Sequence, residues 1–184
     1  LIQNMLKNGA YLINAAQVKQ LEDVVLVWSK PKKEGEQPKR VINKDWVGRD
    51  AKKILAQIGI NVGDDIRCII CETEFSQAFV QTELMMPILP IVRVDTFDEA
   101  VKAEHGNRHS AHLHSKNVDH MTQYAKAICT TIFVKNAPSY AGIGFNAEGW
   151  TTFTIAGPTG EGITSPRSFT RQRRCVLSDA LNII

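Results

Sequence analysis

The sequence lacks any long hydrophobic run and any strong excess of one charge. Its 184 residues include 22 Lys and Arg against 19 Asp and Glu, a formal net charge of +3. Nucleic-acid-binding proteins usually carry a stronger and more clustered basic excess, so no nucleic-acid partner is expected. The uncharged stretch Leu84–Val92 is too short, and too interrupted by proline, to cross a bilayer. We therefore expect no membrane partner either.

Cysteine is scarce, and no secretory leader is recognisable. The chain has four cysteines. It begins at Leu1 without the charged start and apolar core of a signal peptide. Both features favour free thiols and a cytoplasmic location. The first residues have the pattern of a helix that ends at Gly9, and a helix starting at residue 1 indicates a fragment of a longer protein.

What the chain does contain is ordinary for a globular protein. Hydrophobic residues make up 43% and charged residues 22%, which excludes a disordered, collagen-like or coiled-coil chain. A chain of this length forms one domain, or one domain with an appendage, and needs no disulfide or metal to stabilise it.

Hydrophobic periodicity predicts alternating helices and strands. The expected helices are Ala15–Val27 (buried face Val18, Leu21, Val25 and Trp28), Asp45–Ile58 (ended by Gly59), Thr96–Glu104 and Asn117–Ile128 (buried face Val118, Met121, Ala125 and Ile128). The expected strands are Ile66–Cys71, Leu89–Val94, Ser110–Ser115 and Thr130–Val134. Thr96 and Glu99 form a capping box, and Asn117 is the second cap. This alternation predicts an α/β fold with a largely parallel sheet covered by helices.

The last fifth of the chain has a different character. Glycines punctuate it, and its two strand candidates are Trp150–Ala156 and Arg174–Leu177. We therefore expect a domain at 1–145 and a tail at 146–184, whose strand would pair with another subunit. A charged surface loop is expected at Ser29–Arg40.

The cysteines offer weak candidates for chemistry. Cys68 and Cys71 form C-x-x-C without a second pair, and on a strand they would point to opposite faces. Two buried thiols are therefore favoured over a zinc site. Cys129 ends a helix, where the dipole weakens a nucleophile. Cys175 follows two arginines and is the best local candidate for a nucleophile, although a buried strand cysteine remains the favoured interpretation.

Histidine and arginine clusters leave further alternatives open. His112 and His114 share one face of a predicted strand and could begin a metal site, although hydrogen-bonded strand histidines are favoured. The basic residues of the tail could bind phosphate, although an interface or ion-pair network is favoured; they are Arg167, Arg171, Arg173 and Arg174. No complete dinucleotide fingerprint or P-loop is present.

Several segments together resemble one family. Thr82–Val94 is similar to the E-x-F-G-P segment of the aldehyde dehydrogenase superfamily. Three more segments resemble its CoA-acylating branch, in the form found in ethanolamine and propanediol utilisation: Lys44–Arg49, Gly149–Ser165 and Phe169–Leu177. The resemblance begins near Ala15 and implies the C-terminal portion of such an enzyme.

The resemblance implies an activity and its participants. The family oxidises a short aldehyde with NAD through a cysteine thioester, which CoA then releases as acyl-CoA. It implies a homo-oligomer, a dimer or tetramer, in the cytoplasm or inside a bacterial microcompartment. Acetaldehyde and propionaldehyde are not distinguished.

The resemblance also implies roles for individual residues. Glu83 matches the glutamate that hydrogen-bonds the nicotinamide ribose, Met85 stands where phenylalanine usually packs against the nicotinamide, and Pro87 matches. Met86 replaces a glycine, so the local backbone is expected to differ. The nucleophilic cysteine is expected upstream of Leu1, so the chain alone should be inactive. The alternative is a non-enzymatic assembly or regulatory domain with the same fold.

Overall fold

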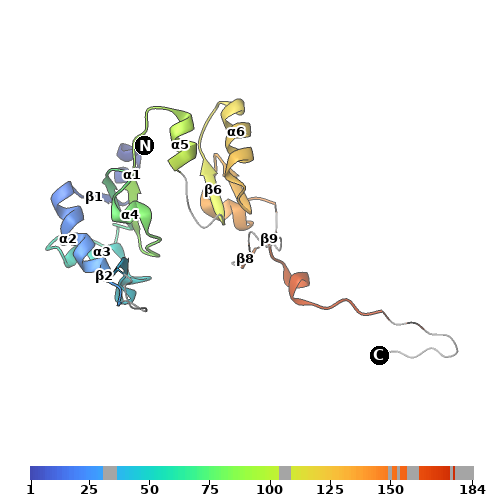
Figure 1. Ribbon diagram of the computed structural model, residues 1–184, viewed down its shortest axis with the longest axis horizontal. Helices are drawn as coiled ribbons and strands as arrows, with labels where there is room; N and C mark the ends of the chain where they lie inside the picture. The colour runs from blue at the N-terminus through green and yellow to red at the C-terminus, as the bar shows by residue number, and fades with distance from the viewer. Residues whose placement is uncertain are drawn as a thin grey trace. The chain divides into compact units, whose positions relative to one another are not determined.

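The computed structural model describes residues 1–30, 37–103, 109–148, 151–152, 154–156, 162–174 and 176. The chain forms two compact units, Leu1–Asp95 and Thr96–Ile184, and helices and strands alternate along both (Figure 1). The expected division after residue 145 falls inside the second unit, and a separate tail from residue 146 stays a prediction. Among the described helices, none is both long and apolar enough to span a membrane.

The first unit is built around a three-stranded parallel sheet in the order β1-β4-β5. Its elements are α1 (Ile2–Lys7), β1 (Ala10–Leu12), α2 (Ala15–Val25), β2 (Leu26–Trp28), β3 (Arg40–Ile42), the 3-10 helix η1 (Lys44–Trp46), α3 (Ala51–Ala56), β4 (Cys68–Glu72), α4 (Ala78–Gln81) and β5 (Ile88–Ile91). Within β5, Pro90 lies opposite Cys71. The predicted α/β class, with a parallel sheet flanked by helices, is confirmed.

Helices α2 and α3 each contribute three buried residues to the core beside this sheet. Asn14 caps α2, because the Asn14 side chain accepts a hydrogen bond from the Gln17 backbone N–H at 3.0 Å. Val18, Leu21 and Val25 are buried against residues of β4, β5 and α3 in one continuous cluster. Burial of such aliphatic side chains is the main favourable contribution to folding.

The expected helix Ala15–Val27 is wrong at its C-terminal end. The helix ends at Val25, and the next three residues form β2, which pairs antiparallel with β3. Trp28 is therefore not on the buried helix face and is 65% exposed. The physical reason is the hairpin: strand pairing satisfies the backbone of Leu26–Trp28 in place of helical bonds.

The expected surface loop Ser29–Arg40 is wrong at its end, because Arg40 begins β3. Its residues 31–36 lie outside the described residues.

The expected helix Asp45–Ile58 is interrupted. It consists of η1 and α3, separated by an irregular segment at residues 47–50 in which Gly48 has φ +70°. A left-handed residue cannot continue a right-handed helix, so the chain turns at Gly48 before α3 begins. Gly59 follows α3 with φ +76°, as expected for a residue that ends a helix.

The second unit contains a two-stranded parallel ribbon and its crossover helix. Its elements are α5 (Phe97–Ala103), β6 (Ser110–Leu113), α6 (Val118–Ile128), β7 (Ile132–Lys135), the 3-10 helix η2 (Ser139–Ile143), β8 (Ile155–Ala156), β9 (Gly162–Ile163) and the 3-10 helix η3 (Pro166–Phe169). β6 and β7 are parallel, and β8 and β9 form a short antiparallel pair. Both predicted caps are confirmed: Glu99 N–H donates to the Thr96 hydroxyl, and Asn117 caps α6.

The predicted face of α6 is wrong in its register. Tyr124 and Ile128 are buried, whereas Val118 is 69% exposed and Ala125 is also exposed. Aromatic packing explains the rotation, because Tyr124 contacts the rings of Phe97 and Phe133 at centroid distances of 6.5 and 5.5 Å.

The tail strands expected at Trp150–Ala156 and Arg174–Leu177 are covered only in part. Of the first, Ile155–Ala156 is a strand, while Trp150 and Phe153 lie outside the described residues. Of the second, Arg174 and Val176 are described and are not in a strand, while Cys175 and Leu177 lie outside the described residues.

Candidate functional site

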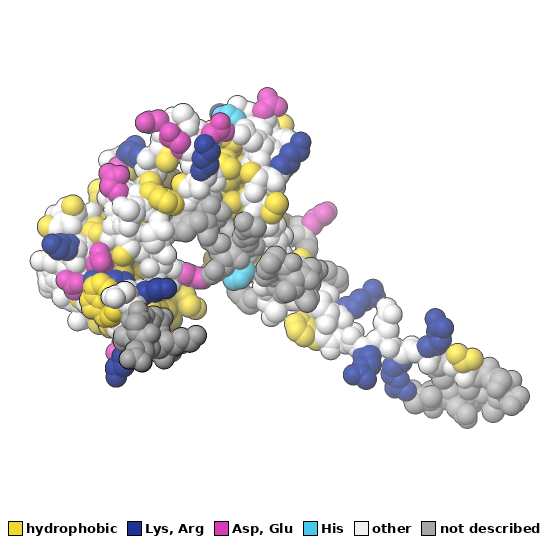
Figure 2. All heavy atoms as spheres, in the orientation of Figure 1, with side chains coloured by type: hydrophobic (Ala, Val, Ile, Leu, Met, Phe, Trp, Pro, Cys, Tyr) yellow, Lys and Arg dark blue, Asp and Glu magenta, His cyan; other side chains and the backbone are white. Residues whose placement is uncertain are grey.

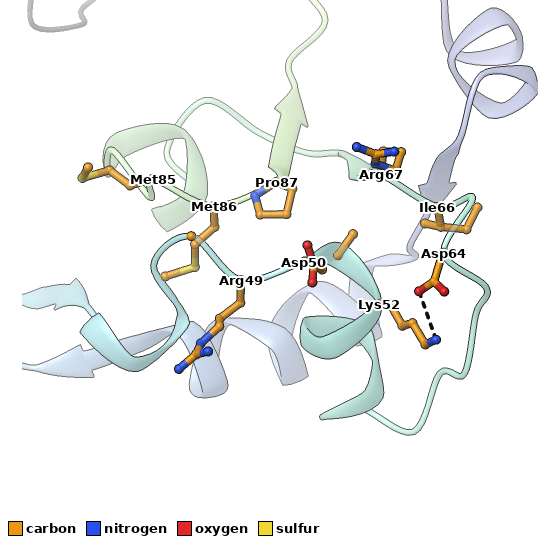
Figure 3. Close-up of a pocket in the computed structure, with 11 residues that line it drawn as sticks. Arg49, Asp50, Lys52, Asp64, Ile66, Arg67, Met85, Met86 and Pro87 are labelled. Atoms are coloured by element: carbon orange, nitrogen blue, oxygen red, sulfur yellow. Dashed lines mark hydrogen bonds and ion pairs between the residues drawn. The ribbon is translucent and has the colours of Figure 1, made fainter. Parts of the chain in front are cut away.

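A cavity of about 430 Å³ lies in the first unit, at the edge of the parallel sheet where β4 and β5 begin. Because parallel strands start at the same edge, the segments that precede them meet there. The residues before and at the start of α3 form a third segment of the cavity wall (Figure 3). The cavity is lined by Gly48, Arg49, Asp50, Ala51, Lys52, Asp64, Ile66, Arg67, Met85, Met86 and Pro87.

The segment before β5 has an unusual backbone at Met85. Met85 has φ +54°, in the left-handed region that L-amino acids rarely adopt. Its side chain is 63% exposed and extends away from the other lining residues, whereas Met86 points toward the Arg49 segment (Figure 3). Met86 packs against the main core. The expectation that the local backbone differs from that of the family at Met86 stays a prediction.

Backbone hydrogen bonds connect this segment to its neighbours. The Pro87 carbonyl accepts from the Ile69 N–H of β4 at 2.8 Å. The Met85 carbonyl accepts from the Gly48 N–H at 3.2 Å. The second bond joins two segments that both carry the family resemblance and lie 37 positions apart in the sequence.

The charges that line the cavity are of both signs. Lys52 Nζ lies 3.1 Å from Asp64 Oδ1, and Asp50 pairs with Lys53 outside the lining at 3.5 Å. Arg49 Nε donates to the Asp45 carbonyl at 3.1 Å. All of these side chains are substantially exposed, so each pair contributes little to stability. The lining is therefore polar and mixed in charge, without a dominant anion-attracting field.

The structure brings together two of the three residues predicted for the cofactor. Met85 and Pro87 both line the cavity, whereas Glu83 is exposed just before them and is not part of the lining. Glu83 contributes an exposed carboxylate with hydrogen-bond acceptors, and Met85, two residues later, contributes an exposed thioether. That combination fits a nicotinamide riboside, which has hydroxyl groups and a flat ring.

Sequence reasoning assigned no role to several residues at this edge. Asp64, Ile66 and Arg67 line the cavity because they precede β4, and Gly48 reaches Met85 through its backbone. The available signal was the predicted parallel sheet, because the starts of parallel strands lie at the same edge, and β4 and β5 do pair in parallel.

The two cysteines of β4 lack the features of a nucleophile. Cys71 is fully buried, and burial raises its thiol pKa to about 11. Burial also raises the pKa of Cys68. Cys129 is exposed in a left-handed conformation after α6. All three are free thiols; of the C-x-x-C pair, Cys71 is buried as expected, whereas Cys68 is only partly buried. Cys175 lies outside the described residues.

His112 lies in β6 of the second unit, and His114 follows directly after this strand. Burial, followed by the neighbouring charge of His114, lowers the pKa of His112. In the described part of the chain, no three His, Cys, Asp or Glu side chains are arranged to hold a metal ion. A metal site at His112 and His114 therefore gains no third ligand from these residues.

The basic tail residues form no ion pair with the described side chains. Arg167, Arg171, Arg173 and Arg174 are all exposed, and no ion pair joins any of them to a described carboxylate. Figure 2 shows basic side chains distributed along this segment. The interface and phosphate interpretations of this cluster both remain predictions.

Known proteins are similar to this chain over nearly its whole length. No family model matches it. The acetylating acetaldehyde dehydrogenase EutE of Salmonella typhimurium is 51% identical over 179 residues, 95% of this chain and 37% of the relative. The CoA-propanoylating propanal dehydrogenase of Citrobacter freundii is 42% identical over 188 residues, 100% of this chain and 38% of the relative.

Solved structures give the same result. The propionaldehyde dehydrogenase of Rhodopseudomonas palustris, with bound propionyl-CoA, superposes with a TM-score of 0.81 at 50% identity, over 96% of this chain and 38% of that one. The chain is homologous to part of the CoA-acylating aldehyde dehydrogenases. The family resemblance expected from the sequence is thereby confirmed.

Two further structures of this dehydrogenase class are informative. A propionaldehyde dehydrogenase from a fucose-utilisation microcompartment of Clostridium phytofermentans has a TM-score of 0.80 and 53% identity, over 98% of this chain and 40% of that one. An engineered glycolyl-CoA reductase with bound NADP+ has a TM-score of 0.81 and 50% identity, over 96% and 39%. The chain thus spans about two fifths of the length of its relatives.

Proposed function

We propose that this chain is the part of a CoA-acylating aldehyde dehydrogenase that supplies the nicotinamide-facing loop Glu83–Pro87. The whole enzyme would convert a short aldehyde, CoA and NAD to acyl-CoA and NADH. The observation that carries the proposal is the cavity at the start of β4 and β5, where two segments of the family resemblance meet through the bond from Gly48 to Met85. The named relatives support it.

The loop residues take distinct roles in this proposal. Glu83 is exposed and accepts hydrogen bonds from the ribose hydroxyls. Met85, which is 63% exposed, packs its thioether against the ring. Pro87 fixes the backbone between them and β5, and its carbonyl is held by Ile69. NAD, when bound, accepts the hydride. NAD itself comes from the family resemblance, and a similar structure holds NADP+.

The nucleophilic cysteine belongs, in this proposal, to a part of the enzyme outside this chain. Cys68 and Cys71 support that view because their pKa values are raised, and none of the three described cysteines lines the cavity. A thiolate is required for attack on the aldehyde, and a raised pKa removes it at neutral pH.

The enzyme would act as a homo-oligomer, a dimer or a tetramer, in the cytoplasm or inside a bacterial microcompartment. A relative from a fucose-utilisation microcompartment supports the second location.

The test is a chimera in which this chain replaces the matching part of Salmonella typhimurium EutE. We expect NADH formation that requires both acetaldehyde and CoA, and no activity from the 184-residue chain alone. The purified chimera is checked for cooperative thermal unfolding. Acetaldehyde is compared with propionaldehyde as the substrate, and NAD is compared with NADP as the hydride acceptor. The faster reaction in each pair identifies the preferred aldehyde and the preferred cofactor.

A folded chimera without aldehyde- and CoA-dependent activity contradicts the proposal. If the chain alone then forms a tight complex with full-length EutE in size-exclusion chromatography, the alternative of a non-enzymatic assembly domain is favoured.

A further inference from the structure

The exposed Met85 holds a backbone conformation that is costly for its residue type. With φ +54°, it lies in the left-handed region, where the Cβ atom of an L-residue crowds the following carbonyl. Such a conformation persists only where the surrounding structure enforces it. Because the Met85 side chain is 63% exposed, its own packing contributes little to that enforcement.

The first support comes from the next residue. Met86 packs against the main core of the first unit, and its carbonyl accepts from the Ile88 N–H at 2.8 Å. The side chains of Met85 and Met86 diverge (Figure 3). The left-handed turn at Met85 is what allows Met86 to reach the core while Met85 stays outside.

The second support comes from a distant part of the chain. The Gly48 N–H donates to the Met85 carbonyl at 3.2 Å. Gly48 has φ +70°, so the direction of this N–H depends on a backbone conformation that glycine adopts readily and other residues do not. An added Cβ at Gly48 would meet nothing within 4 Å, so no side-chain clash explains the glycine.

We infer that Gly48 and Met86 are positioning residues, which together hold Met85 in its left-handed conformation as a preformed surface for the nicotinamide ring. This inference rests on the proposed function, because the ring is the ligand of the proposed reaction. Met85 would contact the cofactor, whereas Gly48 and Met86 act only through Met85.

The first experiment compares two glycines in the EutE chimera. Gly59 has φ +76° and, like Gly48, meets nothing within 4 Å where a Cβ would be added. It follows α3 and has no bond to the Met85 segment among the described contacts. Gly48→Ala and Gly59→Ala should therefore lower the melting temperature by similar amounts.

Only Gly48→Ala should change the kinetics. We expect it to raise the KM for NAD about tenfold. The left-handed conformation costs an L-residue about 1–2 kcal/mol, and a free energy of that size corresponds to about a tenfold change in an equilibrium constant. The KM values for aldehyde and CoA should change less than about twofold, because the altered contact concerns the nicotinamide alone. An equal effect of Gly59→Ala on the KM for NAD would overturn the inference.

The second experiment tests Met86 by truncation and rescue. Met86→Ala removes the packing against the core and should also raise the KM for NAD. Met86→Leu keeps the apolar volume and should return the KM to within about twofold of the starting value. Failure of Met86→Leu to improve on Met86→Ala would exclude positioning through packing.

A measurement on the 184-residue chain separates this inference from the proposed function. The Gly48 amide should exchange its hydrogen slowly, and Met86→Ala should accelerate that exchange, because the Met85 carbonyl leaves its place. Fast Gly48 exchange in the unmodified chain overturns the inference even if the chimera is active. An inactive chimera with a protected Gly48 amide overturns the proposed function and, with it, the role of Met85.

Discussion

At the scale of single residues, burial decides which of the described thiols can react. Cys71 belongs to the main core and is fully buried, whereas Cys129 lies exposed after α6. Burial disfavours the charged thiolate and raises the pKa of Cys71 from 9.0 to about 11.

We expect Cys129 to be alkylated by iodoacetamide at pH 8 long before Cys71. The raised pKa alone lowers the thiolate fraction of Cys71 about a hundredfold, and burial slows access further. Peptide mass spectrometry after timed labelling measures both sites in the same sample. A second sample in denaturant is the control, in which the two thiols should react at similar rates. Equal labelling in the folded chain would contradict the assigned burial.

At the scale of elements, Arg40 links the end of α2 to the β2–β3 hairpin. Its Nη2 donates to Asp23 Oδ1 at 2.7 Å and to Glu22 Oε1 at 3.2 Å, and its Nη1 donates to the Leu26 carbonyl at 3.4 Å. The guanidinium also lies 5.1 Å from the ring centroid of Trp28. The hydrogen bonds and charges of Asp23 and Glu22 raise the pKa of Arg40, the bond to Asp23 contributing most.

Arg40→Ala should lower the free energy of unfolding by about 1–2 kcal/mol, because several weak ion pairs and a cation–π contact are lost together. Arg40→Lys should recover only part of the loss, since an ammonium lacks the planar fork. Urea denaturation measures both. Lys53→Ala, which breaks the exposed pair with Asp50, is the control and should change stability by less than about 0.5 kcal/mol. A similar loss in the control would deny Arg40 its linking role.

The elements also show what the sequence can predict. The caps at Thr96 and Asn117 follow from local patterns, and both form as expected, because a cap needs only its own few residues. The place where α2 gives way to β2 depends on pairing with a strand fourteen residues away, so helical spacing wrongly included Trp28.

The candidate site was predictable to a similar degree. Met85 and Pro87 could be proposed because a motif carries them. The bond from Gly48 to Met85 could not, because it depends on how α3 is placed against the sheet. The prediction of the buried face of α6 was wrong for the same reason, because the aromatic partners of Tyr124 decide which side of the helix is buried.

At the scale of the whole molecule, the described buried residues are divided unequally between the two units. The cluster of the first unit has thirteen buried members, from Ile13 to Ile88. The described cluster of the second has three, which are Ala111, Tyr124 and Ile128. Because burial of apolar surface drives folding, the first unit has the larger described source of stability.

We therefore expect amides of β4 to exchange their hydrogens more slowly than those of β6 and β7 in the full chain. Hydrogen–deuterium exchange followed by mass spectrometry reports each strand separately. Ile70→Ala, at a fully buried position of β4, should accelerate exchange throughout the first unit, with a loss of about 2–5 kcal/mol. Protection of β6 and β7 equal to that of β4 would show that the described clusters do not set local stability.

Pro90 gives the three-stranded sheet a protection against misassembly. The carbonyl of Pro87, just before β5, accepts from Ile69 of β4, and the carbonyl of Ile91 accepts from Thr73, just after β4, so by alternation the backbone of Pro90 faces the opposite side. β5 is at one edge of the sheet among the described strands, and proline has no N–H to offer there. The missing N–H of Pro90 therefore removes no hydrogen bond within the sheet. It also leaves the exposed edge without a donor that a strand of another molecule would need for pairing, which discourages edge-to-edge aggregation.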